Sequence, residues 1–309
     1  MQINAHGPSS SVCGLAARGG VISRRASTMP TTRAIVADAI VAAMSGPFEI
    51  GIPTQLSEID DLSAVLVQSL GFPADRVVDW VRALGPEHLR IARRGAHVAG
   101  VYGVIPMGLW FGGRAVPTGG VTAVAVALED RSSGVGSQLM RHSLAEMRAA
   151  HYPLAALYPA TYPIYRRAGY ETAGTRIAYS LDLRALDIRD VEPLTVERYG
   201  PDHEAAVRAC YDRRARQTAG NIARTAYLWS RVLGPVNAKV HAYVIKTGDD
   251  VEGFVAFSQK DVAVNPRYEL TVRDFLAPTA RAGRRILRLL ADHRSMADHA
   301  ILYGAPSEP

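Results

Sequence analysis

The residues best suited to chemistry form a short glycine-bearing string, Arg131-Ser132-Ser133-Gly134-Val135-Gly136, between a Val/Ala-rich segment and an amphipathic one. Glycines in such a turn let the backbone approach a ligand closely, and a helix start presents unpaired N–H groups with partial positive charge. Both features suit a phosphate or pyrophosphate. The string lacks the Lys-Ser/Thr pair of a P-loop and does not follow the first strand of a parallel unit, so ATP and NAD are poorly supported.

Two tyrosines, Tyr165 and Tyr170, follow about 30 residues after the glycine string. Aromatic packing of a helix on a sheet is the simpler interpretation of such a pair taken alone. His88, His97, His142 and His151 show no metal-ligand spacing, and no Cys-His or Ser-His-Asp pattern surrounds Cys210, so we expect no metal site and no hydrolase triad.

These residues need a scaffold, and the periodicity of the first half supplies one. Apolar residues three or four apart predict a helix at 57–70 with Ser57 as its cap, and a shorter helix is expected at 75–84. The Val-, Ile- and Tyr-rich segments that follow are typical of antiparallel strands at 89–93, 97–105, 109–117 and 120–127. A helix at 137–150, a strand at 154–158, a helix at 161–167 and a strand at 177–183 complete a mixed α+β domain over residues 51–184.

The second half repeats part of this order. We expect helices at 205–214 and 281–292 and strands at 241–245, 251–258 and 269–276. Residues 270–290 lay out strand, loop and helix as residues 121–147 do, with Gly283 as the one loop glycine. The sequence therefore predicts a second domain over 185–309, a tandem copy that has lost its loop chemistry.

Composition excludes several classes of protein. The chain has 309 residues, 48% hydrophobic and 21% charged, which is typical of a globular protein of about two domains. Its net charge of +6 arises partly from four arginines ahead of the first acid, Asp38, and no basic stripe favours nucleic acid. The uncharged run 95–113 is broken by glycines and Pro106, so we expect strands and no membrane span. The two cysteines, Cys13 and Cys210, favour reduced thiols in a cytoplasmic protein, and residues 1–50 are expected to be a disordered extension rather than a targeting segment.

Two stretches carry a resemblance to a known family. Val121-Thr122-Ala123-Val124-Ala125-Val126 followed by Arg131-x-x-Gly134-x-Gly136 resembles motif A of the GNAT acetyltransferase superfamily. Pro153-Leu154-Ala155-Ala156-Leu157 followed by Pro163-Ile164-Tyr165-Arg166-Arg167-Ala168-Gly169-Tyr170 is similar to the Eis (enhanced intracellular survival) family of N-acetyltransferases. Tyr211-Asp212, Gly220-Asn221-Ile222-Ala223-Arg224 and Trp229 fit the central, degenerate GNAT-like domain of that family.

The resemblance implies transfer of an acetyl group from acetyl-CoA to a primary amine, with acetyl-CoA as co-substrate and no metal. It implies that residues 131–136 cradle the pyrophosphate and that the main chain of Val124, Ala125 and Val126 binds the pantetheine arm, where ordinary ladder bonding is the alternative. It also makes Tyr165 the general acid that protonates the departing thiolate. A homo-oligomer is expected, because the family forms hexamers.

The first two helices indicate the charge of the acceptor. Acids outnumber bases there, with Glu58, Asp60, Asp61, Asp75 and Asp79 against Arg76. In GNAT folds these helices border the acceptor site, so a cationic aminoglycoside, polyamine or lysine-like amine would be favoured. The alternative is a solvated acidic helix face.

The resemblance covers only part of the length of Eis-family chains. Eis-family proteins continue into a third, sterol-carrier-like domain, whose terminal carboxylate helps to deprotonate the amine. We expect that domain and that carboxylate to be absent from this chain, which ends at Pro309. The alternative function is therefore a non-catalytic CoA-binding or assembly module that keeps the cradle without a complete acceptor site.

Overall fold

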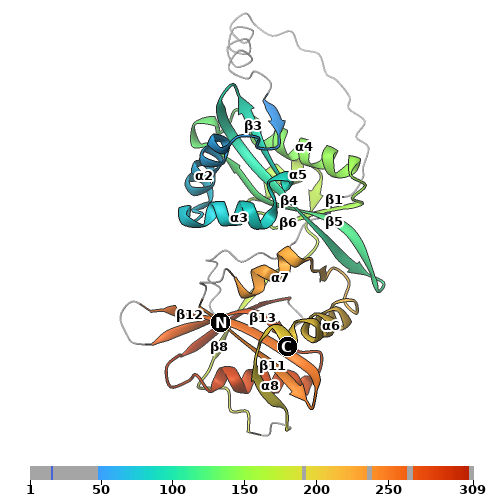
Figure 1. Ribbon diagram of the computed structural model, residues 1–309, viewed down its shortest axis with the longest axis vertical. Helices are drawn as coiled ribbons and strands as arrows, with labels where there is room; N and C mark the ends of the chain where they lie inside the picture. Colours follow the sequence, from blue (N-terminus) through green and yellow to red (C-terminus); the bar gives the residue numbers. More distant parts are fainter. Residues whose placement is uncertain (1–14, 17–47, 190–192, 235–238, 263–266, 306–309) are drawn as a thin grey trace, which may run out of the picture. The chain divides into compact units, whose positions relative to one another are not determined.

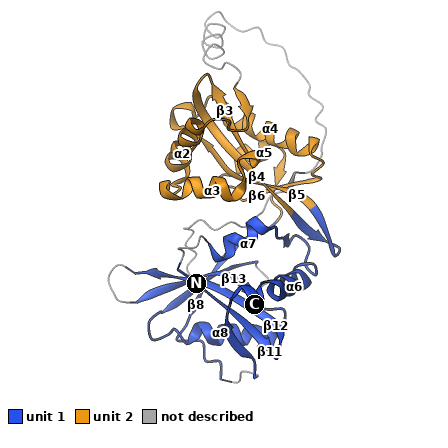
Figure 2. Ribbon diagram, in the orientation of Figure 1, with its two compact units in different colours: residues 1–11, 108–116, 174–309 blue, residues 12–107, 117–173 orange. Residues whose placement is uncertain are grey.

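A computed structural model describes residues 15–16, 48–189, 193–234, 239–262 and 267–305 (Figure 1). The chain forms two compact units (Figure 2). The N-terminal unit, unit 2 in the figure, comprises residues 12–107 and 117–173. The C-terminal unit, unit 1, comprises residues 1–11, 108–116 and 174–309. Each unit contains a mixed sheet with helices packed on it, as the α+β expectation required.

The sheet of the N-terminal unit is ordered β2-β3-β4-β5-β6. Its strands are β2 (Glu49–Gly51), β3 (Leu89–Arg94), β4 (His97–Phe111), β5 (Arg114–Val126) and β6 (Leu154–Leu157). Strands β2, β3 and β4 are antiparallel, whereas β5 and β6 run parallel. This parallel pair is the part of the sheet that positions the candidate site.

The four strands expected between residues 89 and 127 are in fact three. Pro106 lies inside β4, and the chain reverses at Gly112 and Gly113, whose φ angles of 54° and 77° suit a tight turn. The second glycine pair, Gly119 and Gly120, lies inside β5 and marks no break. A Cβ at Gly119 would collide with Met147 of the overlying helix, so this glycine serves close packing.

The helices of the N-terminal unit follow the expected order. They are α2 (Leu56–Leu70), α3 (Val77–Leu84), α4 (Val135–Ala149) and α5 (Tyr162–Arg167), with 3-10 turns η1 (Ala74–Arg76), η2 (Pro86–His88) and η3 (Leu128–Asp130). The cap expected at Ser57 is wrong. Glu58 caps α2, since its Oε2 accepts from the N–H groups of Thr54 and Gln55 at 2.6 and 3.1 Å.

The sheet of the C-terminal unit is ordered β8-β14-β13-β12-β11-β9. Its strands are β8 (Ile177–Asp182), β9 (Thr195–Arg198), β11 (Val240–Thr247), β12 (Asp250–Asp261), β13 (Tyr268–Leu276) and β14 (His299–Gly304). Its helices are α6 (Glu204–Ala215), α7 (Ala226–Leu233) and α8 (Ala280–Ala291), with the turn η4 (Pro201–His203) and a short strand β10 (Ile222–Ala223). Strands β13 and β14 run parallel, with α8 between them in the chain, as α4 lies between β5 and β6.

Two segments belong to a different unit from the one expected. The strand at 177–183, expected to close the first domain, is β8 and pairs along its whole length with β14 of the C-terminal unit. The tip of the β4–β5 hairpin, residues 108–116, also groups with the C-terminal unit, where Gly108 and Leu109 pair with β10. Strand alternation is visible in the sequence, but the partner of an edge strand depends on which ladder is left unpaired.

Apolar side chains fill both faces of the C-terminal sheet. Val255 and Phe257 of β12 point to one face, where they pack with Ile286 of α8, and Phe254 points to the other, where Val207 of α6 packs. Cys210 is buried in this second cluster, and burial raises the pKa of its thiol. Cys13 lies outside the described residues.

The N-terminal extension is described only in part. Leu15–Ala16 form β1, which pairs with β7 (Tyr170–Glu171), and Phe48 is buried beside the strand β2. The expectation for the rest of residues 1–47 lies outside the described residues. None of the helices in the described ranges is long and apolar enough to cross a membrane.

Candidate functional site

Strands β5 and β6 stop pairing after a short parallel ladder. The pairs run from Thr118 with Leu154 to Val121 with Leu157, where β6 ends. Strand β5 continues for five residues, from Thr122 to Val126, without that neighbour. Ala123 has a φ of 52°, a value that L-residues rarely adopt and that marks an irregularity in the strand. The result is a fork between two parallel strands, open toward their carboxyl ends.

The main chain of β5 presents polar groups to this fork. The Ala127 N–H donates to the Ala99 carbonyl of β4 at 2.9 Å, and the Ala125 carbonyl also faces β4, since it would lie 2.9 Å from a Cβ built on Gly100. Backbone groups alternate between the two edges of a strand, so those of Val124 and Val126 face the fork. An extended chain of amides could pair there. Ala125, by contrast, belongs to the β4 ladder, as the alternative interpretation of that segment allowed.

One contact in the fork was not anticipated from the sequence. The Ser69 hydroxyl, in the last turn of α2, donates to the Val126 carbonyl at 2.6 Å. Nothing in the helical pattern of α2 distinguishes Ser69 from Ser63, whose hydroxyl donates to Ile59 of its own helix at 2.6 Å. Only the packing of α2 beside the end of β5 brings Ser69 to the strand.

The glycine string forms the turn into α4. Ser132 and Gly134 have positive φ values of 67° and 90°, and α4 begins directly after Gly134 with no side-chain cap. The first N–H groups of a helix have no partner within it, so an uncapped start leaves them available to a ligand. A Cβ at Gly134 would meet no atom within 4 Å, which shows that the space above the turn is open. Glycine is favoured here by the backbone angle.

The remaining members of the string have different roles. Gly136 is buried, and a Cβ there would lie 3.0 Å from Ile164 of α5, so this glycine lets α5 approach α4. Val135 is buried under the sheet, whereas Ser133 donates its hydroxyl to the Asp130 carbonyl at 2.7 Å. Arg131 is exposed and has no ion pair among the residues the structure describes, which leaves its charge available to an anion.

Tyr165 lies at the closed end of the fork, where β5 and β6 stop pairing. It packs in one apolar cluster with Val121 and Leu157, the last paired residues of β5 and β6, and with Val124 at its margin. Its ring meets that of Tyr170 edge-on, with centroids 6.3 Å apart. Burial raises the pKa of the Tyr165 hydroxyl, so the group keeps its proton at neutral pH. Within the described residues this hydroxyl has no hydrogen-bond partner.

The fork, the turn and Tyr165 therefore come together in one region of the N-terminal unit. A general acid must carry a proton and must be free to donate it, and Tyr165 meets both conditions. An open strand edge and a turn that suits an anion both precede it in the chain. The arrangement can hold an extended ligand with an anionic end and protonate a leaving group at its other end.

Some of the acids on α2 and α3 already have partners within the protein, so fewer are available to a ligand than the sequence suggests. Glu58 binds Arg93 in addition to capping α2, and these contacts lower its pKa to about 2. Asp79 pairs with Arg82 at 2.8 Å. Asp60, Asp61 and Asp75 remain exposed, so the part of the patch available to a cation is smaller than the sequence implied.

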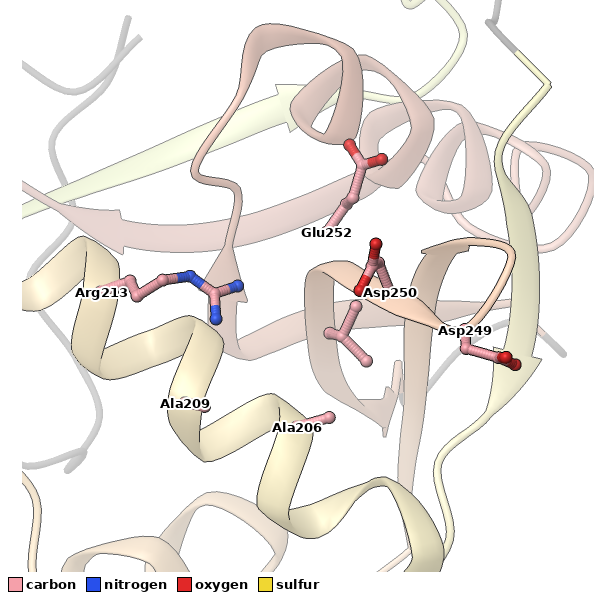
Figure 3. Close-up of a pocket in the computed structure, with 7 residues that line it drawn as sticks. Ala206, Ala209, Arg213, Asp249, Asp250 and Glu252 are labelled. Carbon is pink, nitrogen blue, oxygen red and sulfur yellow. The ribbon is translucent and has the colours of Figure 1, made fainter.

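A surface pocket lies elsewhere, in the C-terminal unit (Figure 3). It has a volume of about 420 Å³ and lies between α6 and the β11–β12 hairpin, where Arg213 extends from the helix and Asp249 turns away from the other acids. It contains none of the residues predicted to do chemistry. In the described ranges no group of three or more His, Cys, Asp or Glu side chains is placed to hold a metal ion.

Comparison with known families agrees with this geometry. An acetyltransferase (GNAT) domain family matches residues 52–173, and a second acetyltransferase (GNAT) domain family matches residues 220–309. Each half of the chain thus matches an acetyltransferase (GNAT) domain. The chain carries two GNAT domains in tandem, which confirms the predicted fold and the predicted repeat.

Individual relatives support the same class. An uncharacterised N-acetyltransferase from Streptomyces griseus is 25% identical over 204 residues, which are 58% of this chain and 47% of that protein. Another from Streptomyces coelicolor is 30% identical over 157 residues, 47% of this chain and 38% of that protein. The chain spans about half the length, or less, of the curated relatives it matches.

Solved structures show the same architecture. A GCN5-related N-acetyltransferase from Anabaena variabilis has a TM-score of 0.78 at 27% identity, covering 84% of this chain and 66% of its own. Eis1 from Mycobacterium abscessus has a TM-score of 0.65 at 22% identity, covering 85% and 67%. The second match is a likeness of fold.

Proposed function

We propose that this protein transfers the acetyl group of acetyl-CoA to a primary amine, with the reaction centred on the fork between β5 and β6. The observation that carries the proposal is the convergence of an uncapped α4 start, an open β5 edge and a protonated, unpartnered Tyr165 in one GNAT domain. The residues fit the co-substrate, because the free N–H groups after Gly134 and the charge of Arg131 suit a pyrophosphate. Val124 and Val126 suit the amide arm.

The chemistry assigned to the site balances without a further reactant. The amine nitrogen attacks the thioester carbonyl carbon, the C–S bond breaks, and Tyr165 gives its proton to the departing sulfur. The amine gives its proton to solvent. Tyr165 then takes a proton from solvent to replace the one it gave to the sulfur. The raised pKa of Tyr165 keeps its hydroxyl protonated at neutral pH.

We infer a cationic acceptor of aminoglycoside, polyamine or lysine-like chemistry. The support is the set of exposed acids on α2 and the turn before α3, namely Asp60, Asp61 and Asp75. An Eis-type assignment and a homo-oligomer belong to the same proposal. They rest on the sequence motifs and on the fold shared with Eis1 from Mycobacterium abscessus.

The test is thiol release from acetyl-CoA with a panel of polyamines and aminoglycosides, alongside calorimetric binding of CoA to the same protein. Amine-dependent release supports acetyl transfer. Binding without turnover supports the alternative, a CoA-binding or assembly module. Absence of CoA binding would overturn both.

Tyr165→Phe separates the proposed acid from the rest of the site. We expect kcat to fall roughly 10²-fold while CoA binding persists, because only the donated proton is lost. Tyr162→Phe is the matched control, since Tyr162 lies on the same helix α5 but is 56% exposed. An unchanged kcat in Tyr165→Phe would remove that residue from the mechanism.

A further inference from the structure

Asp130 is an unusual residue to find beneath a turn that suits an anion. Its side chain is only 7% exposed, and Asp130 is the one buried ionisable carboxylate residue among those described. The carboxylate lies between an imidazole and a guanidinium from the β3–β4 hairpin. His97 Nε2 lies 2.6 Å from Oδ2, and Arg94 Nη1 lies 3.5 Å from Oδ1.

The backbone of the same residue shapes the turn. The Asp130 carbonyl accepts from both the N–H and the hydroxyl of Ser133, at 3.2 and 2.7 Å. The Asp130 N–H donates to the Ala127 carbonyl at 3.1 Å. Asp130 therefore joins the end of β5 to the glycine turn and ties both to the neighbouring hairpin.

This anchorage holds a conformation that the turn would not adopt unaided. Ser132 has a φ of 67°, in the left-handed region that is unfavourable for an L-residue. Such a strained residue persists only where its surroundings fix it, and the bonds to Asp130 are the fixing contacts on either side of Ser132. They leave the N–H groups after Gly134 uncapped.

Charge gives a second reason for the arrangement. A buried carboxylate requires a partner, and an unpaired one would also repel a phosphate in the turn. Arg94 offsets the charge of Asp130, and the ring of His97 adds a hydrogen bond to the carboxylate. The other nearby acid is Glu129, 4.0 Å from the His97 ring. The exposed charge of Arg131 then remains for the ligand.

We propose that Asp130 and His97 form a clamp that presets the glycine turn for the pyrophosphate of CoA. Both are positioning residues, since neither needs to touch the ligand. The inference rests on the proposed function. A preset turn loses less conformational freedom on binding, so removal of the clamp should weaken CoA binding without altering the chemical step.

The experiment compares CoA affinity, measured by calorimetry, in wild type, Asp130→Asn and His97→Ala. We expect each variant to raise the Kd for CoA about tenfold and to raise KM for acetyl-CoA in parallel. We expect kcat at saturating acetyl-CoA to stay unchanged. A raised KM with an unchanged kcat would not result from a general loss of folded protein, which lowers kcat. The double variant should cost less than the sum of the two, because both act through one contact.

His88→Ala is the matched control. His88 lies at the other end of β3 and has its own carboxylate partner, with Nε2 3.7 Å from Glu87 Oε1. We expect its CoA affinity to match wild type. Hydrogen exchange of the 128–138 segment in the free protein gives a readout independent of turnover, and we expect faster exchange in both clamp variants.

The outcomes separate the two proposals. If wild type binds no CoA, the proposed function fails. If wild type binds CoA and the clamp variants bind it equally well, with wild-type exchange of the 128–138 segment, the clamp alone is overturned. Asp130→Asn is the variant least disruptive to folding, since it keeps the shape of the side chain and removes only the charge that holds Arg94 and His97 to the carboxylate.

Discussion

The two GNAT domains start corresponding helices in opposite ways. Helix α4 begins after Gly134, which has a φ of 90° and no side chain with which to cap the helix. Helix α8 begins after Thr279, whose extended backbone lets its hydroxyl accept from the Ala282 N–H at 3.3 Å. The first helix start leaves its N–H groups for a ligand, whereas the second satisfies one of them within the chain.

The strands that precede these helices differ in the same way. In the N-terminal unit, Val124 and Val126 of β5 face a fork. In the C-terminal unit, β13 is tied to its own surroundings, with Arg273 donating to the Val232 carbonyl at 2.9 Å and Asp274 binding Arg224 through two bonds of 2.6 and 2.9 Å. One architecture thus leaves a strand edge and a helix start open in one copy and ties the corresponding elements by internal bonds in the other. A shared fold therefore does not imply a shared site.

The strongest test of this contrast is the internal ion pair of the C-terminal unit. Arg224→Ala should lower the free energy of unfolding by about 3–5 kcal/mol, because it leaves the Asp274 carboxylate, whose side chain is only 10% exposed, without its partner. Denaturant unfolding measures the change. Arg189→Ala, which breaks the exposed pair with Asp187, should leave stability unchanged within the error of the measurement, because water screens that pair. A similarly small loss in Arg224→Ala would show that the pair is dispensable.

The glycines of the two helix starts give the next test. Gly134→Val should raise the Kd for CoA at least tenfold, since valine at a positive φ distorts the turn that presents the N–H groups. Gly283→Ala in α8 should leave CoA binding unchanged and add about 0.5–1 kcal/mol of stability, because its Cβ would lie 3.6 Å from Ala277. Calorimetry and thermal unfolding check both variants. Equal CoA affinities in the two would contradict the contrast.

Glu58 tests whether the acids of α2 serve stability or the acceptor. Its folded-state pKa of about 2 lies below the ordinary 4.5, so its stabilisation is present above pH 4.5 and is lost as the pH falls toward 2. Glu58→Gln should cost about 1 kcal/mol at pH 7, through loss of the α2 cap and the Arg93 pair, and almost nothing at pH 2. Unfolding at the two pH values measures this. A pH-independent difference would overturn the assignment.

The smallest expected effect concerns the β5 edge. Ser69 occupies the Val126 carbonyl, so Ser69→Ala should free that acceptor and tighten CoA binding by up to about fivefold, the equivalent of one hydrogen bond of about 1 kcal/mol. Ser63→Ala removes a hydroxyl bonded within the same helix and should leave affinity unchanged. Weaker binding in Ser69→Ala would show instead that the serine supports the ligand.

Local patterns in the sequence were sufficient for the elements of the site. The helix at 137–150, the short strand at 154–158 and the helix at 161–167 correspond to α4, β6 and α5 to within a few residues. The boundaries missed were those that depend on distant packing. Gly119 and Gly120 suggested a turn, but they lie within β5 because Met147 of α4 packs over the sheet at Gly119.

The order of the elements, the glycine turn and Tyr165 can be predicted from the sequence, because backbone angles and apolar periodicity act over a few residues. Tertiary packing sets where β6 stops beside β5, and it brings Ser69 to Val126 across 57 residues and His97 to Asp130 across 33. It also places β8 in the sheet of the C-terminal unit. Such contacts depend on how the whole core packs, and short-range sequence patterns do not predict that packing.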